Sequence, residues 1–162
     1  MASPWHPYVP PRNQRPDLEL YAQAGQVGFF TIRSFGTSRP FTMPALNGAV
    51  VDVLPAERLK LRVALYVYCL MPDHLHTLIG PQEDCRSMLT FVDQFKGKST
   101  RVAWGHGCRG KLWQKRSHDH FVRQSEDLVA IGQYILDNPV RRGLAQSQGD
   151  YPWAGLVEPL PL

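Results

Sequence analysis

His74 and His76 flank Leu75 in an apolar stretch of the chain, and two histidines at this spacing can bind one metal ion. Because a β-strand alternates its side chains between two faces, residues i and i+2 project from the same face. Leu75 then points the other way, into the core. Histidine is the commonest metal ligand, but this pair alone also fits ordinary strand histidines that satisfy local hydrogen bonds.

Tyr134 and Asn138 form a second candidate pair, four residues apart and therefore one turn apart on one side of a predicted helix. They flank an apolar stripe that would anchor the helix, formed by Leu128, Ile131 and Ile135. This geometry allows Asn138 to donate an oxygen ligand and Tyr134 to act as a nucleophile beside the metal. The same residues also fit a helix-edge tyrosine in water and an asparagine that ends the helix.

Together the two pairs point to phosphoryl transfer onto a tyrosine. That reaction needs an activated nucleophile and a cation that holds and polarises the phosphate. Two imidazoles and one amide oxygen leave coordination positions open for phosphate and water. Mg²⁺ or Mn²⁺ suits this chemistry, and imidazole ligands favour Mn²⁺.

His118 and His120 form a competing pair with the same spacing. They follow Trp113 and Gln114, where the chain reads as strand or loop. A second metal site is one interpretation, and orienting or DNA-contacting roles, for His120 in particular, are the other.

The pattern of apolar residues predicts an α+β domain of the ferredoxin-like or RRM-like kind, with an antiparallel sheet and helices packed on one face. The predicted order is βαββαβα. Pro55 should break the first helix, and the last helix should begin at a Ser125 cap and end near Asp137, because Pro139 disfavours the helical conformation of the preceding residue. The predicted strands are 27–35, 62–70, 74–79 and 112–116, and the helices are 44–61, 86–104 and 125–137.

The chain has 162 residues, 43% of them hydrophobic, and a net charge of +4. This predicts one domain over residues 25–153, an extended proline-rich basic arm over 1–24 and a C-terminal tail over 154–162. The positive charge favours a polyanionic partner. No run is long enough to span a membrane, the N-terminus does not resemble a secretion signal, and three cysteines without paired spacing suit a reducing cytoplasm.

The stretch Met71-Pro-Asp-His-Leu-His76 resembles the HUH motif of single-strand DNA transposases with one catalytic tyrosine. Three further runs resemble the branch associated with repetitive extragenic palindromes, the REP-associated tyrosine transposases. These runs are Trp113 to Arg123, Tyr134-Ile-Leu-Asp-Asn-Pro-Val-Arg-Arg-Gly-Leu144 and Tyr151-Pro-Trp153. The resemblance extends from about Phe29 to Trp153. It implies that His74, His76 and Asn138 bind the metal and that Tyr134 is the nucleophile, although the wider superfamily more often has Gln in the place of Asn138.

The resemblance implies that the tyrosine attacks single-stranded DNA beside a palindromic hairpin. The products are a 5′-phosphotyrosine and a free 3′-OH, and a second 3′-OH can reverse the step without ATP. We expect a monomer or homodimer that contacts no membrane. The basic candidates for DNA contacts, besides His120, are Arg12, Arg15, Lys96, Lys98, Arg101, Arg123, Arg141 and Arg142.

Two alternatives use the same fold. One is a non-catalytic module that stacks single-stranded bases on aromatic side chains such as Phe29, Tyr66 and Tyr68. The other is an inactive, domesticated descendant of a transposase, against which the intact histidine pair and Tyr134 argue.

Overall fold

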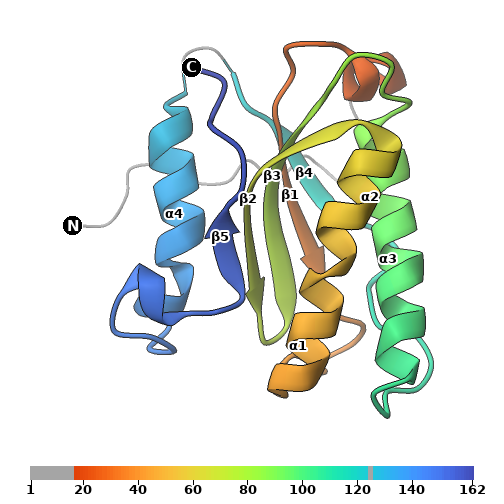
Figure 1. The fold of residues 1–162 in the computed structure, drawn as a ribbon, viewed down its shortest axis with the longest axis vertical. Coiled ribbons are helices and arrows are strands. Elements are labelled where there is room, and N and C mark those ends of the chain that lie inside the picture. The colour runs from red at the N-terminus through yellow and green to blue at the C-terminus, as the bar shows by residue number, and fades with distance from the viewer. Residues whose placement is uncertain (1–16, 124–125) are drawn as a thin grey trace.

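The computed structural model describes residues 17–123 and 126–162. They form a five-stranded antiparallel sheet with strand order β4-β1-β3-β2-β5, so the predicted α+β class is confirmed (Figure 1). The strands are β1 (Gly28–Arg33), β2 (Val63–Met71), β3 (His74–Pro81), β4 (His118–Phe121) and β5 (Ala154–Leu156). The helices are α1 (Pro44–Val51), α2 (Val53–Leu61), α3 (Met88–Trp104) and α4 (Leu128–Arg141), with short 3-10 turns at Leu18–Ala22 and Gln148–Asp150.

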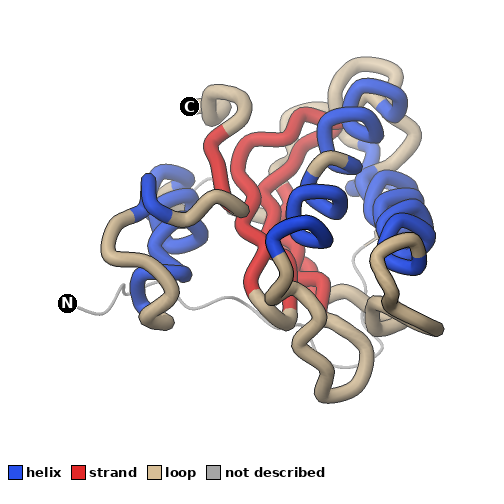
Figure 2. The backbone as a smooth tube through the Cα atoms, turned by 60° about the horizontal axis from the view of Figure 1, so that its bottom comes forward, coloured by secondary structure: helices blue, strands red, loops and turns tan. Residues whose placement is uncertain are grey.

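The helices cover both faces of the sheet, which differs from the predicted one-sided packing. α1, α2 and α3 lie on one face and α4 lies alone on the other, as Figures 1 and 2 show. Phe30 and Leu75 point into the core under the three helices, whereas Phe29 and Leu78 pack with Ile135 of α4. The period of two along β1 and β3 supplies an apolar set for each face.

β2 and β3 form the predicted hairpin. Met71 pairs with His74 across the turn at Pro72 and Asp73, and the register shifts once, between Leu65 and Val67. β3 lies between β1 and β2 and is buried along its whole length. The histidine pair therefore sits at the start of a central strand, where the surrounding sheet holds the backbone in place.

The break in the first helical region follows from Pro55, as predicted. α1 ends at Val51 and α2 begins at Val53, so Pro55 occupies the first turn of α2. Because a proline has no amide hydrogen, the carbonyl of the residue four positions earlier loses its helical hydrogen bond. That residue is Val51, where α1 ends.

The predicted fourth strand over 112–116 is wrong. Trp113 makes only an isolated bridge to Ser34, and the true edge strand is β4, which begins at His118. Leu112 and Trp113 are buried because they pack on the core beneath the three helices. Their apolar character reflects this packing, which has the same signature in the sequence as a short strand.

The last helix differs from the prediction at both ends. Ser125 lies outside the described residues, and Asp127 is the cap, accepting hydrogen bonds from the amides of Val129 and Ala130. The helix also continues through Pro139 to Arg141. Pro139 lies close to the C-terminal end of the helix, so it removes few of the helical hydrogen bonds. Beyond it, the amide of Arg142 still donates to the Asn138 carbonyl at 3.0 Å.

The predicted arm and tail both contain residues that pack on the domain. Of the arm, residues 1–16 lie outside the described residues, and the rest includes a 3-10 turn with Tyr21 fully buried. The boundary after Trp153 falls directly before β5, which pairs with β2. Glu158 then forms an ion pair with Arg58 of α2. Among the described helices, none is long and apolar enough to cross a membrane.

Candidate active site

His74 and His76 project from β3 on the face that α4 covers, and Leu75 points to the opposite core, as the strand period predicts. Both imidazoles are buried, with 4% and 7% of their surface exposed. They line a cavity of about 490 Å³ together with residues from β1, β4 and α4. Its lining comprises Phe29, Thr31, Arg33, His74, His76, His118, Asp119, His120, Tyr134, Asn138, Arg141 and Arg142.

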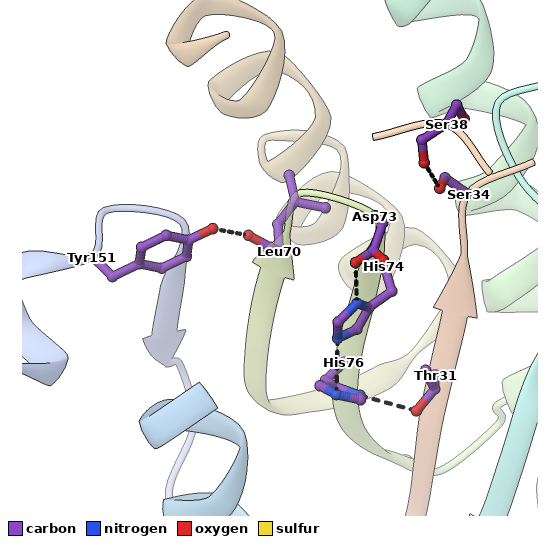
Figure 3. Close-up of polar contacts among 8 residues, drawn as sticks. All are labelled: Thr31, Ser34, Ser38, Leu70, Asp73, His74, His76 and Tyr151. Carbon is purple, nitrogen blue, oxygen red and sulfur yellow. Dashed lines mark hydrogen bonds and ion pairs between the residues drawn. The ribbon is translucent and has the colours of Figure 1, made fainter. Parts of the chain in front are cut away.

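A hydrogen bond on Nδ1 orients each imidazole of the pair. Nδ1 of His74 lies 2.7 Å from Oδ1 of Asp73, and Nδ1 of His76 lies 2.9 Å from Oγ1 of Thr31 (Figure 3). The two Nε2 atoms therefore face each other at 3.1 Å. Partners of this kind set the tautomer and orientation of metal-ligating histidines.

Burial lowers the pKa of His74. Burial, the neighbouring His74 and the cavity arginines lower the pKa of His76 well below its ordinary value. Both rings are consequently neutral near pH 7, which is the form that binds metals.

The donor set fits a divalent cation. Two ligand atoms about 2.1 Å from an ion and at right angles to each other are about 3.0 Å apart, close to the separation of the two Nε2 atoms. Among the described residues, no group of three or more His, Cys, Asp or Glu side chains could hold a metal ion. Within residues 17–123 and 126–162, a further ligand would therefore be of another type, and the amide of Asn138 lines the same cavity.

α4 brings Tyr134 and Asn138 to the histidines. The rings of Tyr134 and His76 have centroids 6.3 Å apart, and Asn138 is 4% exposed on the same side of the helix. Ile131 and Ile135 are fully buried against the sheet and anchor α4. The predicted convergence of the strand pair and the helix pair is therefore present in the fold.

Three arginines surround this cluster. The guanidinium of Arg141 lies over the Tyr134 ring at 4.0 Å and donates a 3.3 Å hydrogen bond to the Tyr134 carbonyl. Arg33 of β1 and Arg142 also line the cavity. Within the described part of the chain, none of the three forms an ion pair with a carboxylate, so their charges can serve an anionic ligand.

The competing pair on β4 is not arranged like the first. Nε2 of His120 lies 2.8 and 3.0 Å from the carboxylate oxygens of Glu126, so the ring is held by an acid. His118 lies opposite Thr31 on the neighbouring strand and is exposed. Both histidines line the cavity beside the first pair.

The other predicted DNA contacts are scattered. Arg12 and Arg15 lie outside the described residues. Lys96, Lys98 and Arg101 belong to α3, on the opposite face of the sheet from the cavity. Lys98 is paired with the buried Glu57. Of the predicted cations, Arg141, Arg142 and His120 are brought to the cavity, and Arg123 follows β4 without lining it.

The three aromatic residues named as a possible stacking platform are not exposed. Phe29 is 2% exposed and Tyr66 and Tyr68 are half-buried. Sequence reasoning also missed two residues of the site, Thr31 and Arg33 of β1. Their spacing of two predicts that both side chains lie on one face of β1. Nothing in the sequence, however, shows that β1 pairs with β3.

Comparison with known proteins bears on the family of this chain. The model of the family described as "Transposase IS200 like" matches residues 49–138, more than half of the chain. A candidate REP-associated tyrosine transposase of Haemophilus influenzae is 28% identical over 97 residues, 53% of this chain and 54% of that protein. The REP-associated tyrosine transposase of Escherichia coli is 26% identical over 91 residues, 54% and 50% of the two chains. The chain thus spans about half the length of the curated relatives it matches.

A solved structure of a REP-associated tyrosine transposase bound to a REP hairpin has the same fold. Its TM-score is 0.69 at 19% identity, over 94% of this chain and 82% of that one. Since the matched segment of the family model contains β2, β3, α3, β4 and nearly all of α4, it includes the histidine pair, Tyr134 and Asn138. The chain belongs to the IS200-like transposase family.

Proposed function

We propose that this protein nicks and rejoins single-stranded DNA through a covalent bond between Tyr134 and the 5′ phosphate of the cleaved strand. The observation that carries the proposal is the convergence of the Tyr134 ring and the histidine pair in one arginine-lined cavity. A nucleophile, a candidate cation site and unpaired positive charge are the parts that phosphoryl transfer requires.

The chain's own residues orient the reacting groups. Asp73 and Thr31 hold the two imidazoles with their Nε2 atoms facing one point. His74, His76 and Asn138 would hold Mg²⁺ or Mn²⁺, and when bound this cation polarises the scissile phosphate. Arg141 packs on the Tyr134 ring and limits its rotation, while Arg33 and Arg142 offer positive charge to the phosphate.

The reaction conserves one phosphodiester bond. The Tyr134 oxygen forms a bond to phosphorus, the bond from phosphorus to the 3′ oxygen breaks, and the phenolic proton is replaced by one on the departing 3′ oxygen. A second 3′-OH reverses these changes and joins the strands. Because the phosphotyrosine retains the bond energy, no ATP is needed.

The proposed substrate is a DNA hairpin with a single-stranded flank. The similar solved structure holds a REP hairpin, and this chain shares its fold. All the proposed groups come from one chain, so a monomer would hold a complete site. There are two alternatives on the same fold, a non-catalytic binding module and an inactive descendant of a transposase. The experiment below tests the proposed function against both.

The experiment is incubation with Mn²⁺ and a hairpin oligonucleotide labelled on the 3′ side of the cleavage site, followed by denaturing electrophoresis. The expected result is a labelled protein adduct that maps by mass spectrometry to the peptide containing Tyr134. Tyr134→Phe should form none, whereas Tyr66→Phe, changed outside the cavity, should retain it. Bound but intact DNA with the unchanged protein would refute the proposal and support the binding module.

A further inference from the structure

A second groove lies between the C-terminal half of α3 and the segment that precedes β4. Its volume is about 560 Å³. Two large aromatic side chains line it and remain half exposed, Phe35 at 49% and Trp104 at 52%. Exposed aromatic rings are costly to leave in water, and rings at a groove wall are the usual platform for stacked bases.

The walls of this groove are held by specific contacts. The indole N–H of Trp104 donates to the Gly110 carbonyl at 2.8 Å, and the ammonium of Lys96 donates to the Lys115 carbonyl at 2.9 Å. The ammonium of Lys111 lies 5.5 Å from the centre of the Phe35 ring. Both aromatic rings thus have neighbours that restrict their movement.

The charge of the groove has one sign. Lys96, Lys111 and Lys115 line it, and no described Asp or Glu does. Lysines beside half-exposed rings fit a polyanion that carries flat, stackable groups, which is the chemistry of single-stranded nucleic acid.

Two backbone segments connect the groove with the cavity around Tyr134. Arg33 lines the cavity and Phe35 lines the groove, two residues further along the chain. On the neighbouring segment Lys115 lines the groove and His118 lines the cavity. At about 3.3 Å per extended residue, these connections are roughly 7 and 10 Å long, within reach of a short stretch of single-stranded DNA.

We propose that the groove binds the single-stranded flank of the DNA whose phosphate enters the Tyr134 cavity, with bases stacked on Trp104 and Phe35 and phosphates beside the lysines. The inference rests on the proposed function for the identity of the strand. It adds a second binding site with its own residues. This site lies on the face of the sheet that α3 covers, opposite the Tyr134 cavity.

The test measures binding to two labelled oligonucleotides by fluorescence anisotropy. One is the hairpin with a flank just long enough to reach the cavity, and the other has the flank extended in the 5′ or the 3′ direction. The variants are Trp104→Ala and the double variant Lys111→Ala/Lys115→Ala. Arg86→Ala, which removes an exposed charge at the other end of α3, is the matched control.

We expect the extension to tighten binding to the unchanged protein and to quench its tryptophan fluorescence. Trp104→Ala should weaken binding of the extended DNA roughly 5- to 150-fold, the loss of about one stacked base, and leave the short DNA nearly unaffected. In the double lysine variant, the magnitude of the slope d log K/d log[salt] should decrease by about 1.4, which is about 0.7 for each lost phosphate contact. Arg86→Ala should change neither.

An extension that adds no affinity, or Trp104→Ala and double lysine variants that bind like Arg86→Ala, would overturn the groove proposal even where the Tyr134 adduct forms. Conversely, a missing adduct together with Trp104-dependent binding of the extension contradicts only the proposed chemistry. Because Trp104, Lys111 and Lys115 are exposed, the variants should remain folded, and their melting temperatures are measured alongside that of the unchanged protein.

Discussion

The hydroxyl of Thr31 offers a sharp test of how β1 prepares the histidine pair. Thr31 is 8% exposed, and its Oγ1 lies 2.9 Å from Nδ1 of His76. Thr31→Val keeps the shape and the β-branch, so the strand should remain intact. It removes the hydroxyl and leaves a buried ring nitrogen without that partner.

Two effects follow, of different kinds. An unsatisfied buried polar group costs about 1–3 kcal/mol, which lowers the melting temperature of a domain of this size by roughly 2–12 °C. Loss of the partner that orients a ligand also weakens metal binding by roughly 10- to 100-fold. The assays are thermal unfolding in EDTA, followed by Mn²⁺ titration of the folded protein by calorimetry.

Thr77→Val is the matched control, because Thr77 is also buried and its hydroxyl donates a hydrogen bond to the Val67 carbonyl, away from the histidines. It should lose stability by a similar amount yet keep its affinity for Mn²⁺. If Thr31→Val binds Mn²⁺ as tightly as Thr77→Val, or if the unchanged protein binds none, the assignment of Thr31 as a positioning residue is wrong.

Two further predictions concern stability. Since the pKa of His76 is well below its ordinary value of 6.5, the unfolded chain binds the proton more tightly than the native state. In metal-free buffer, the contribution of neutral His76 to the free energy of unfolding is complete above pH 6.5. Below pH 6.5 it decreases by about 1.4 kcal/mol per pH unit until the native pKa is reached. Urea unfolding between pH 5 and 7.5 measures the slope, and a His76→Asn variant with an unchanged slope would show that another group is responsible. Asp127→Ala should destabilise α4 by about 0.5–2 kcal/mol, because two amide groups lose their cap, and faster hydrogen exchange confined to the first turn of α4 would be the measured sign. Unchanged exchange there would contradict the role of Asp127 as the cap.

Much of the site follows from local sequence patterns. The alternation of side chains on a strand is enough to place His74 and His76 on one face and Leu75 on the other. Helical periodicity likewise places Tyr134 and Asn138 beside the buried Ile135 stripe. These are properties of one segment at a time, and they depend on backbone geometry that any strand or helix shares.

Errors arose where packing and local pattern leave the same signature. The local pattern around Trp113 predicts a strand, but Trp113 is apolar because it packs in the core, and β4 begins later, at His118. Pro139 is tolerated in α4 because so little of the helix follows it. Strand β5 was missed because three residues, Ala154 to Leu156, carry too little pattern.

By itself the sequence determined which residues share a face and which types of chemistry they allow, because side-chain direction is set by the backbone within each element. Only the tertiary structure decided that α4 covers the histidine face of the sheet and that β1 contributes Thr31 and Arg33 to the cavity. Those contacts join segments that are far apart in the chain. They depend on which apolar faces pack together, and a single segment carries no record of its partner.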